Sequence, residues 1–458
     1  MPPPPSALPR RQFLARTAAF LALAPGSAPA LPTPAWLWSG AVTATSATVL
    51  AAFERLAGPV PPLLVSDRRD LGGARAVEGR AVRTPSRSQP GRVVVEYALV
   101  NLASNREYFG GFQTGSGTLV RFRTFGTGAF SFTAAFASCA GGTRIVPLSH
   151  VSNSRVFDAI AALDPHVFIH MGDFHYYNIT GAARPLEPLM GQFRLSLDSV
   201  LSQEHQVLFY RRTPIVYMWD DHDYGVNDSD GKSPTRDAAR AYYATDVPHY
   251  PLPIGPNADG PISQVFDIGR VRFLVTDARS ERLPDEHTML GLRQFKWLID
   301  ELGRAVADRV PLVAWVNPVP WIARDGEGHG WGAYTAERQA IGDRISSLEL
   351  GSRLLMLSGD GHMLAFDDGR NNAHGGFVVA HAAPLDRFVR RKGGPYSHEP
   401  PQQKNGQFGT LRIEDTGATI TATLQGHRHI GNGRSTPLPE ARLQVRCNGL
   451  QCELVPGD

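Results

Sequence analysis

The sequence predicts an α/β protein with a mainly parallel sheet, preceded by a small β-sandwich. From Phe130 onward, short apolar runs alternate with segments of helical spacing, which is typical of parallel strands with helices on both faces of the sheet. Before that point, residues 35–128 contain short alternating segments separated by Gly, Pro and Asp turns, without helical periodicity. A length of 458 residues and a hydrophobic content of 42% suit two domains with a sizeable core.

Residues 1–30 predict an export signal. Arg10 and Arg11 precede Phe-Leu, an Ala/Leu-rich run follows, and Ala28-Pro29-Ala30 is typical of a cleavage site. The arginine pair resembles a twin-arginine signal, which exports folded proteins; an ordinary secretory signal is the alternative. The apolar run is too short to span a bilayer, so we expect no transmembrane segment. We therefore expect a periplasmic or secreted protein that uses the twin-arginine export machinery.

The charge distribution argues against a nucleic-acid-binding protein. The formal net charge is +3, and the leader contains Arg10, Arg11 and Arg16 but no acidic residue. The rest of the chain therefore carries equal numbers of basic and acidic residues, 43 of each. Because non-specific affinity for nucleic acid comes from phosphate neutralisation by Lys and Arg, we expect no stable nucleic-acid complex.

The sandwich domain is expected over residues 31–128, with its boundary at Gly126–Gly128. Its strands are expected at Ala41–Leu50, Pro62–Val65, Arg92–Leu99 and Thr118–Phe125. No residue pattern in this domain indicates chemistry.

The α/β domain is expected over residues 129–458, with a closing β-hairpin near 408–424 and a C-terminal tail. Strands are predicted at Phe132–Ser138, His166–Met171, Ile215–Trp219, Phe273–Thr276, Leu312–Val316 and Leu354–Leu357. Helices are predicted at Val156–Leu163, Leu186–Ser202, Gly291–Leu302 and Thr335–Leu348. The polar, Pro-rich stretch Lys392–Asn405 predicts a surface loop.

Ionisable residues gather where predicted strands end. The clearest case is Tyr217–Asp223, in which three carboxylates and an imidazole follow an apolar run. Burying such groups is costly unless a metal or a partner compensates their charge. Because ligands bind at the carboxyl ends of parallel strands, we expect these groups to form a metal-assisted active site. A polar loop that only caps the strand is the alternative.

Five motifs lie at these strand ends: Ser138-Cys139, Gly172-Asp173-x-x-Tyr176, Trp219-Asp220-Asp221-His222-Asp223, Asp277-x-Arg279-Ser280 and Ser358-Gly359-Asp360-x-His362. Together they resemble the alkaline phosphatase D, or PhoD-like, family of calcineurin-type metallophosphoesterases. The match also covers Trp331-x-x-Tyr334-x-x-x-Arg338, the sandwich and the leader. The resemblance implies four α-β-β-α layers and a secreted phosphatase.

The resemblance also implies roles for individual residues. Asp173 matches a carboxylate that bridges two metals. Asp221 takes the position of a metal-binding Asn, and His222 takes that of the catalytic His. Asp360 and His362 match the final pair of metal ligands.

Three further residues are expected to bind metal. Cys139 and Tyr176 mark this branch and imply Fe³⁺ bound by thiolate, phenolate and carboxylate, with Ca²⁺ as the other metal. Other divalent ions could occupy that second position. Asn317 falls where the superfamily has a metal-binding His, a departure from the pattern. The alternatives are a buried apolar role for Cys139 and packing of Tyr176 against Tyr177 and Phe174.

Neighbouring polar residues have supporting roles in this hypothesis. Asp220 and Asp223 are expected to orient the metal ligands, and Asn227 is a candidate further ligand. Asp277 and Arg279 are expected to form an ion pair at the rim, and Arg279 is also a candidate to bind phosphate oxygens.

We therefore expect hydrolysis of small-molecule or polymeric phosphate esters by a metal-activated hydroxide, with His222 as the general acid. One alternative is a phosphodiesterase acting on nucleic-acid, teichoic-acid or phospholipid diesters. An alternative of another class is an inactive exported binding protein. Cys447 and Cys452 could pair after export, which would leave Cys139 as a free thiol.

Overall fold

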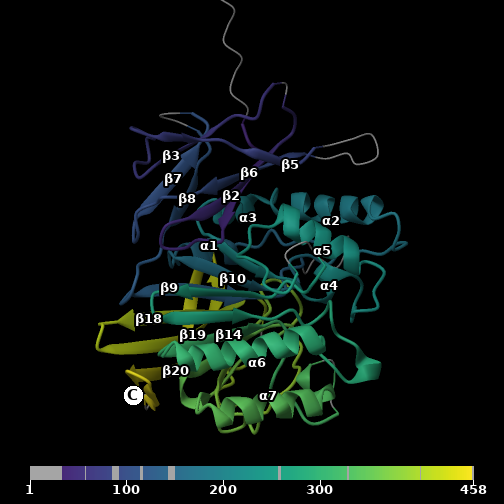
Figure 1. Ribbon diagram of the computed structural model, residues 1–458, viewed down its shortest axis with the longest axis vertical. Helices are drawn as coiled ribbons and strands as arrows, with labels where there is room; N and C mark the ends of the chain where they lie inside the picture. Colours follow the sequence, from purple (N-terminus) through teal and green to yellow (C-terminus); the bar gives the residue numbers. More distant parts are fainter. Residues whose placement is uncertain are drawn as a thin grey trace, which may run out of the picture. The chain divides into compact units, whose positions relative to one another are not determined.

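Two large sheets pack face to face and carry helices on their outer sides (Figure 1). The computed structural model describes residues 33–56, 58–84, 92–113, 117–142, 150–255, 259–326, 328, 330–402 and 404–455. The predicted leader, residues 1–30, lies outside the described residues. No described helix is long and apolar enough to cross a membrane.

The N-terminal strands form two antiparallel groups. They are β1 (Trp36–Gly40), β2 (Ala47–Phe53), β3 (Leu63–Ser66), β4 (Arg75–Val77), β5 (Arg80–Arg83), β6 (Val93–Leu99), β7 (Glu107–Gly111) and β8 (Val120–Arg123). One group has the order β4-β3-β7-β8, and the other has the order β1-β2-β6-β5. Gly40 of β1 also pairs in parallel with Ile215, so the second group continues into the larger sheet of the α/β part. The sequence did not predict this continuity.

The larger sheet has the order β21-β20-β19-β18-β9-β10-β11-β1-β2-β6-β5. Its strands outside the N-terminal group are β9 (Phe132–Ala137), β10 (Val167–Met171), β11 (Ile215–Met218), β18 (Gln407–Asp415), β19 (Thr419–Gly431), β20 (Arg434–Asn448) and β21 (Gln451–Val455). Strands β9, β10 and β11 are parallel, as predicted. The predicted C-terminal hairpin is present as β18 and β19, and β20 and β21 extend it. Cys447 and Cys452 form a disulfide between these last two strands.

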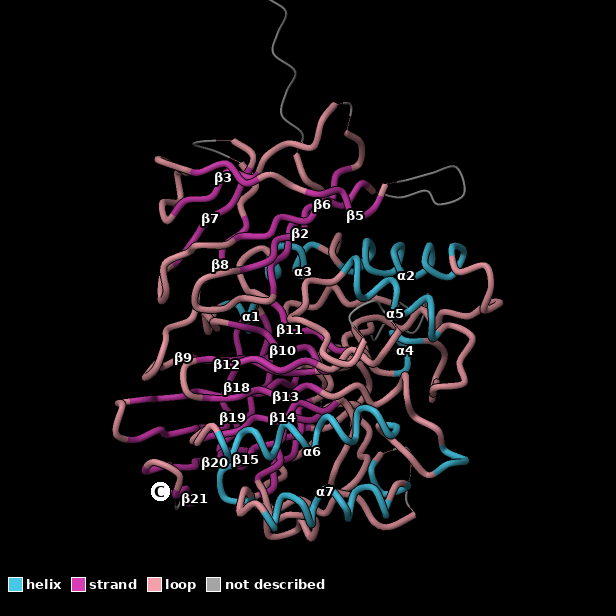
Figure 2. Tube along the Cα trace, in the orientation of Figure 1, coloured by secondary structure: helices cyan, strands magenta, loops and turns pink. Residues whose placement is uncertain are grey.

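The second sheet has the order β12-β13-β14-β15-β17-β16. Its strands are β12 (Gln264–Ile268), β13 (Val271–Val275), β14 (Leu312–Asn317), β15 (Leu354–Ser358), β16 (Leu364–Asp367) and β17 (Val378–Ala382). The described α-helices are α1 (Val156–Ala161), α2 (Glu187–Val200), α3 (Glu204–Tyr210), α4 (Asp221–Tyr224), α5 (Arg236–Asp246), α6 (Gly291–Ala307) and α7 (Thr335–Ser347). Figure 2 shows α6 and α7 on one side of the strands and α2, α3 and α5 above them.

The two faces of β13 show how the layers pack. Phe273 lies in the core between the sheets, with its ring centroid 6.2 Å from that of Phe132 in β9. The next residue, Leu274, packs in a separate core with Leu298 and Leu302 of α6. Successive side chains of a strand point to opposite faces, so β13 contacts both the other sheet and a helix.

On the opposite side, the larger sheet is covered by helices. Phe168 of β10 lies 5.1 Å from Phe209 of α3 by ring centroids, and Phe209 also contacts Phe157 of α1. These aromatic side chains are buried. Together with the packing on β13, this arrangement confirms the predicted four α-β-β-α layers.

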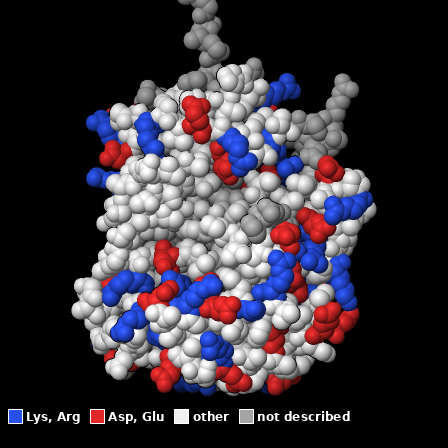
Figure 3. Space-filling view, viewed as in Figure 1, with Lys and Arg blue, Asp and Glu red and all other residues white. Residues whose placement is uncertain are grey.

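Charged side chains of both signs are interspersed on the face shown in Figure 3. Arg272 forms ion pairs with two exposed carboxylates, Asp267 at 2.9 Å and Asp308 at 2.7 Å. This distribution matches the balanced charge of the chain after the leader.

Candidate active site

The residues expected to bind metal lie at the ends of strands or in the segments that follow them. The register pairs His170 of β10 with Ala137 of β9, and Met171 of β10 with Met218 of β11. The three strands therefore end at the same edge, from which the segments with Cys139, Asp173 and Asp221 leave. Parallel strands of an α/β sheet place ligands at this edge.

Two groups of potential metal ligands meet at Asp173. Ligand atoms of Cys139, Asp173 and His362 lie within 4.8 Å of one another, and so do those of Asp173, Asp221 and His222. Asp173 belongs to both groups, which is the geometry that a bridging carboxylate requires. The structure thus brings together residues that are far apart in the sequence.

The backbone turns sharply at these strand ends. Cys139, Asp173, Asp360 and His362 have positive φ angles of 62°, 57°, 64° and 48°. Positive φ is uncommon for residues other than glycine, and such strained residues cluster at functional sites. Gly172 is needed before Asp173, because an added Cβ would lie 2.4 Å from the Cβ of Asp220. The turns direct the polar side chains toward the site at a cost in backbone strain.

Tyr176 contacts both ligand groups. Its hydroxyl donates a hydrogen bond to Oδ2 of Asp173 at 2.6 Å and lies 3.3 Å from Nε2 of His362. Its ring centroid is 4.2 Å from that of His222, and the Arg387 guanidinium lies 3.9 Å above the ring. Tyr176 therefore faces the site.

The aromatic neighbours of Tyr176 pack elsewhere. Phe174 packs against Tyr217, and Tyr177 stacks on His150. The alternative in which Tyr176 serves only to pack with these two neighbours is therefore wrong.

The buried polar atoms of the site fit a bound cation. Oδ1 of Asp173, Oδ2 of Asp220 and Oδ2 of Asp360 are buried without a hydrogen-bond partner among the described residues. Burial raises the pKa of Asp173 to about 6, and it raises the pKa of the Cys139 thiol and of the Tyr176 hydroxyl well above their usual ranges. Buried unpaired oxygens and acids of this kind are stabilised by a positive ion, which favours their deprotonated forms. The donor set therefore fits a metal centre.

Asp223 connects the loops that follow β10 and β11. Its Oδ1 accepts hydrogen bonds from the N–H groups of Phe174 at 2.6 Å and His175 at 3.2 Å. Its Oδ2 accepts one from the N–H of Asp220 at 3.0 Å, and these two aspartates form a capping box on α4. Asp223 thereby sets the position of the loop that carries Asp173, which is consistent with its expected orienting role.

Arg279 lies beneath the site and not at its rim. Its side chain is fully buried, its Nε donates to Oδ1 of Asp220 at 2.5 Å, and its guanidinium lies 3.9 Å from Oδ2 of Asp221. Although burial opposes the shift, the positive charges of Arg279 and His222 hold the pKa of Asp221 below its usual range. The buried Arg279 guanidinium thus stabilises the negative charge of the Asp220 and Asp221 carboxylates.

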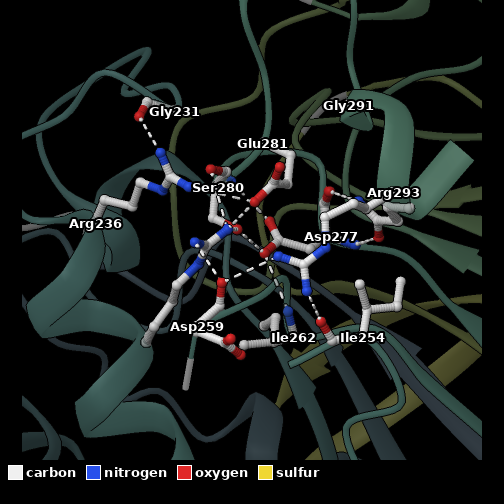
Figure 4. A network of polar contacts seen from close by, with 12 residues as sticks. Gly231, Arg236, Ile254, Asp259, Ile262, Asp277, Ser280, Glu281, Gly291 and Arg293 are labelled. Atoms are coloured by element: carbon white, nitrogen blue, oxygen red, sulfur yellow. Dashed lines mark hydrogen bonds and ion pairs between the residues drawn. The ribbon is translucent and has the colours of Figure 1, made fainter. Parts of the chain in front are cut away.

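The expected ion pair between Asp277 and Arg279 is wrong. Asp277 accepts hydrogen bonds from Nε1 of Trp219 at 2.8 Å and from the N–H groups of Arg279 at 2.9 Å and Ser280 at 3.0 Å. Figure 4 shows Asp277 within the polar network that contains Ser280. Asp277 therefore shapes the backbone after β13, while the Arg279 guanidinium pairs with Asp220.

Replacing Arg279 with Met is expected to destabilise the fold by about 3–5 kcal/mol, because it leaves the buried Asp220 carboxylate without its partner. Urea unfolding followed by circular dichroism would measure the change. Arg184→Met is the control, because Arg184 pairs with Asp237 at an exposed position and its loss should change stability by less than about 0.5 kcal/mol. Equal stability of the two variants would contradict the prediction.

The two asparagines that were candidate metal ligands, Asn317 and Asn227, form hydrogen bonds with other residues of the chain. Asn317 ends β14, where its Nδ2 donates to the Val319 carbonyl at 2.7 Å and its Oδ1 accepts from Oγ1 of Thr276 at 3.4 Å. Asn227 is exposed and donates to Oδ2 of Asp228. Their roles as metal ligands stay predictions.

Sequence reasoning missed Lys392 and Asn178. Lys392 was expected in a surface loop, yet its Nζ lies 2.6 Å from Oδ1 of Asp360 and it lines a cavity of about 320 Å³ with Arg390 and Arg391. Oδ1 of Asn178 lies 2.5 Å from Nδ1 of His222. The one sequence signal for Asn178 is its position five residues after Asp173. The segment around Lys392 is polar, as in an ordinary surface loop, so its composition does not indicate a role at the site.

Comparisons with known proteins agree with this site. A model of the PhoD-like phosphatase family matches residues 134–381, and no curated protein matches the chain. A solved structure described as PhoD is 16% identical, with a TM-score of 0.65, and the match covers 94% of each chain. The purple acid phosphatase PPD1 from yellow lupin seeds is 13% identical, with a TM-score of 0.58 over 89% of this chain and 74% of that one. At these identities the likeness to the two structures shows a shared fold.

Proposed function

The chain belongs to the PhoD-like phosphatase family and is a phosphoric ester hydrolase, and from this premise we propose that it cleaves phosphate esters at a metal centre organised around Asp173. The membership of Asp173 in both ligand groups carries this proposal. The family also removes the alternative of an inactive binding protein.

The donor types divide the proposed centre into two parts. Cys139, Tyr176 and His362 would hold Fe³⁺ together with Asp173, because anionic sulfur and oxygen donors suit that ion. Asp173, Asp221 and Asp360 would supply the carboxylate oxygens that suit Ca²⁺, with Asn317 adding an amide oxygen. Metal ions at such a site neutralise charge on phosphoryl oxygens and lower the pKa of water.

His222 is the proposed general acid. Its Nδ1 is engaged by Asn178 and its ring packs on Tyr176, so Nε2 is the nitrogen left to transfer a proton. An imidazolium can protonate a departing alkoxide near neutral pH, where water donates poorly. The two neighbours restrict the orientation of the ring for that transfer.

The cationic loop beside Asp360 is the proposed phosphate-binding wall. Lys392, Arg390 and Arg391 line the same cavity as Asp360. Ammonium and guanidinium groups bind phosphate oxygens through charge-assisted hydrogen bonds. This wall would hold the ester while His222 protonates the leaving group.

Chelator treatment tests the proposed function directly. Activity on an aryl phosphate monoester should be lost after chelation and return on addition of iron and calcium, whereas an enzyme unaffected by metal removal would refute it. Parallel assays on a bis-aryl phosphate and a natural diester would decide between phosphomonoesterase and phosphodiesterase action. The same hydrolytic chemistry serves both ester classes.

Export by the twin-arginine pathway is also part of the proposal. Arg10 and Arg11 support this pathway, and the disulfide between Cys447 and Cys452 supports export by any route, because disulfides persist mainly in oxidising compartments. Replacing both arginines with lysine should retain the protein in the cytoplasm. Unchanged export of that variant, measured by cell fractionation, would favour an ordinary secretory signal.

Replacing Tyr176 with Phe is expected to abolish visible absorption by the iron-loaded protein. A phenolate bound to Fe³⁺ gives a charge-transfer colour, and phenylalanine has no oxygen donor. Absorption spectra with elemental analysis would measure colour and iron content. Tyr177→Phe is the matched control. The Tyr177 hydroxyl forms a hydrogen bond with the Ser199 hydroxyl, so this variant should leave the colour unchanged. A fully active enzyme without iron would contradict the assignment.

A further inference from the structure

A second cavity lies at the N-terminal end of β11, the opposite end of that strand from Asp221. It has a volume of about 420 Å³ and lies between β7, β8 and the end of α3. Arg211 and Arg212 line it just before β11 begins, whereas Asp221 follows the opposite end of that strand. A volume of this size is within the range of roughly 300–1,000 Å³ that is typical of small-molecule sites.

The lining of this cavity has a large excess of positive charge. Arg69, Arg121, Arg211 and Arg212 line it, and none of its lining residues is acidic. Arg121 is neutralised, because its Nε donates to Glu107 at 2.7 Å and its Nη1 to Asp164 at 2.7 Å.

The remaining arginines lack such partners. Asp70, next to Arg69 in the chain, is already paired with Arg68 at 2.6 Å. Arg69, Arg211 and Arg212 form no ion pair with any carboxylate in the described parts of the chain. Three guanidinium charges therefore remain available at one cavity.

Arg211 is the most informative of these residues. Its Nε is buried without a hydrogen-bond partner among the described residues, and its Nη2 has only a long contact of 3.4 Å with the Ala35 carbonyl. A partly buried guanidinium without an anion is costly to desolvate. The Arg211 carbonyl accepts a hydrogen bond from the N–H of Arg121 at 2.7 Å, which joins β8 to the end of α3 and holds the two arginines at a set spacing.

Apolar side chains form the other part of the lining. Phe109 and Leu119 come from the N-terminal strands and their connection, and Leu208 comes from α3. Leu208 is 51% exposed, so its apolar surface is accessible to a ligand. The cavity thus offers guanidinium groups beside an apolar surface.

We propose that this cavity is a second binding site, for an organic anion with a phosphate or phosphonate head and an apolar or aromatic body. Guanidinium groups bind such tetrahedral heads through paired hydrogen bonds. Phe109, Leu119 and Leu208 would contact the body of the ligand. The hydrogen bond between β8 and the end of α3 fixes the backbone of Arg211, which lowers the cost of ordering this one cation when a ligand binds.

Calorimetric titration of the full-length protein with phenylphosphonate tests this site. The enzyme cannot hydrolyse this probe through ester cleavage, because a carbon–phosphorus bond replaces the ester bond. Two sites are expected on the wild-type protein, the active site and the cavity. Leu208→Glu should abolish the cavity site, because the new carboxylate pairs with the arginines, whereas Leu208→Gln should retain it. Glu and Gln have nearly the same size, so the comparison isolates the charge.

A second variant addresses the arginines themselves. Arg211→Gln with Arg212→Gln should weaken the cavity site by about tenfold or more, since the charge-assisted bonds are lost. Removal of the exposed Arg184 and Arg412 in the same way leaves an equal net charge and should not weaken it. If the wild-type protein shows a single site and Leu208→Glu abolishes it, the result supports binding of phenylphosphonate at the cavity and counts against its binding at the active site. Binding that Leu208→Glu leaves unchanged would overturn the proposal.

Discussion

Replacing Asp173 with Asn is expected to lower kcat/KM for phosphate esters by roughly 1,000-fold. Metal ions supply several kcal/mol of charge stabilisation to phosphoryl transfer, and each 1.4 kcal/mol corresponds to about tenfold in rate. Asp173 is shared by both ligand groups, so its loss disturbs both proposed metal positions at once. Steady-state kinetics and elemental analysis should show activity and metal content falling together.

The stability of this variant separates a metal effect from misfolding. The pKa of Asp173 is raised to about 6 by burial, so its charged form is disfavoured in the folded, metal-free protein. A carboxyl group of raised pKa stabilises the fold while protonated, and this contribution is lost as pH rises through about 6. Asn stays neutral, so metal-free Asp173→Asn should be at least as stable as the wild type at pH 7. Full metal content with unchanged activity would contradict the central role of Asp173.

Replacing His222 with Ala is expected to lower the turnover of alkyl phosphates by about 100- to 10,000-fold, which is the usual contribution of general acid catalysis. Activated aryl esters should lose far less, because their leaving groups depart without protonation. Rates on an alkyl and a nitrophenyl phosphate, measured with the same preparations, test this difference. Equal losses on both substrates would remove His222 from the role of general acid.

Asn178 offers a matched variant for this experiment. Because Asn178 contacts Nδ1 of His222, Asn178→Ala should show the same dependence on the leaving group with a smaller loss, about 10- to 100-fold. A loss that is independent of the leaving group would indicate that Asn178 acts on something other than the His222 ring.

Local sequence patterns were sufficient to predict the helices and strands whose formation depends on neighbouring residues in the sequence. The helix predicted at Leu186–Ser202 is α2, Glu187–Val200, and the strand predicted at Leu312–Val316 is β14, Leu312–Asn317. The helix predicted to end at Leu302 continues to Ala307 in α6. Helices α3 (Glu204–Tyr210) and α5 (Arg236–Asp246) were not predicted; they span only 7 and 11 residues, and their formation depends on packing.

Supporting contacts were harder to predict. Lys392 is 32 residues from Asp360, and Arg279 is 59 residues from Asp220, so no local spacing indicates either pair. A polar surface loop and a loop that places a partly buried lysine against a carboxylate can have the same composition. The chain path alone decides which cation reaches which carboxylate.

The sequence by itself determined the alternation of strands and helices and the positions of polar residues at the strand ends, because both are local and periodic. The motifs at those ends were enough to indicate a metal-dependent phosphatase. Only the tertiary structure decided that the buried Arg279 pairs with Asp220 and that Lys392 reaches Asp360. Those outcomes depend on how two sheets pack and how long loops return to one edge, which is settled by the burial of the whole core and not by any one segment.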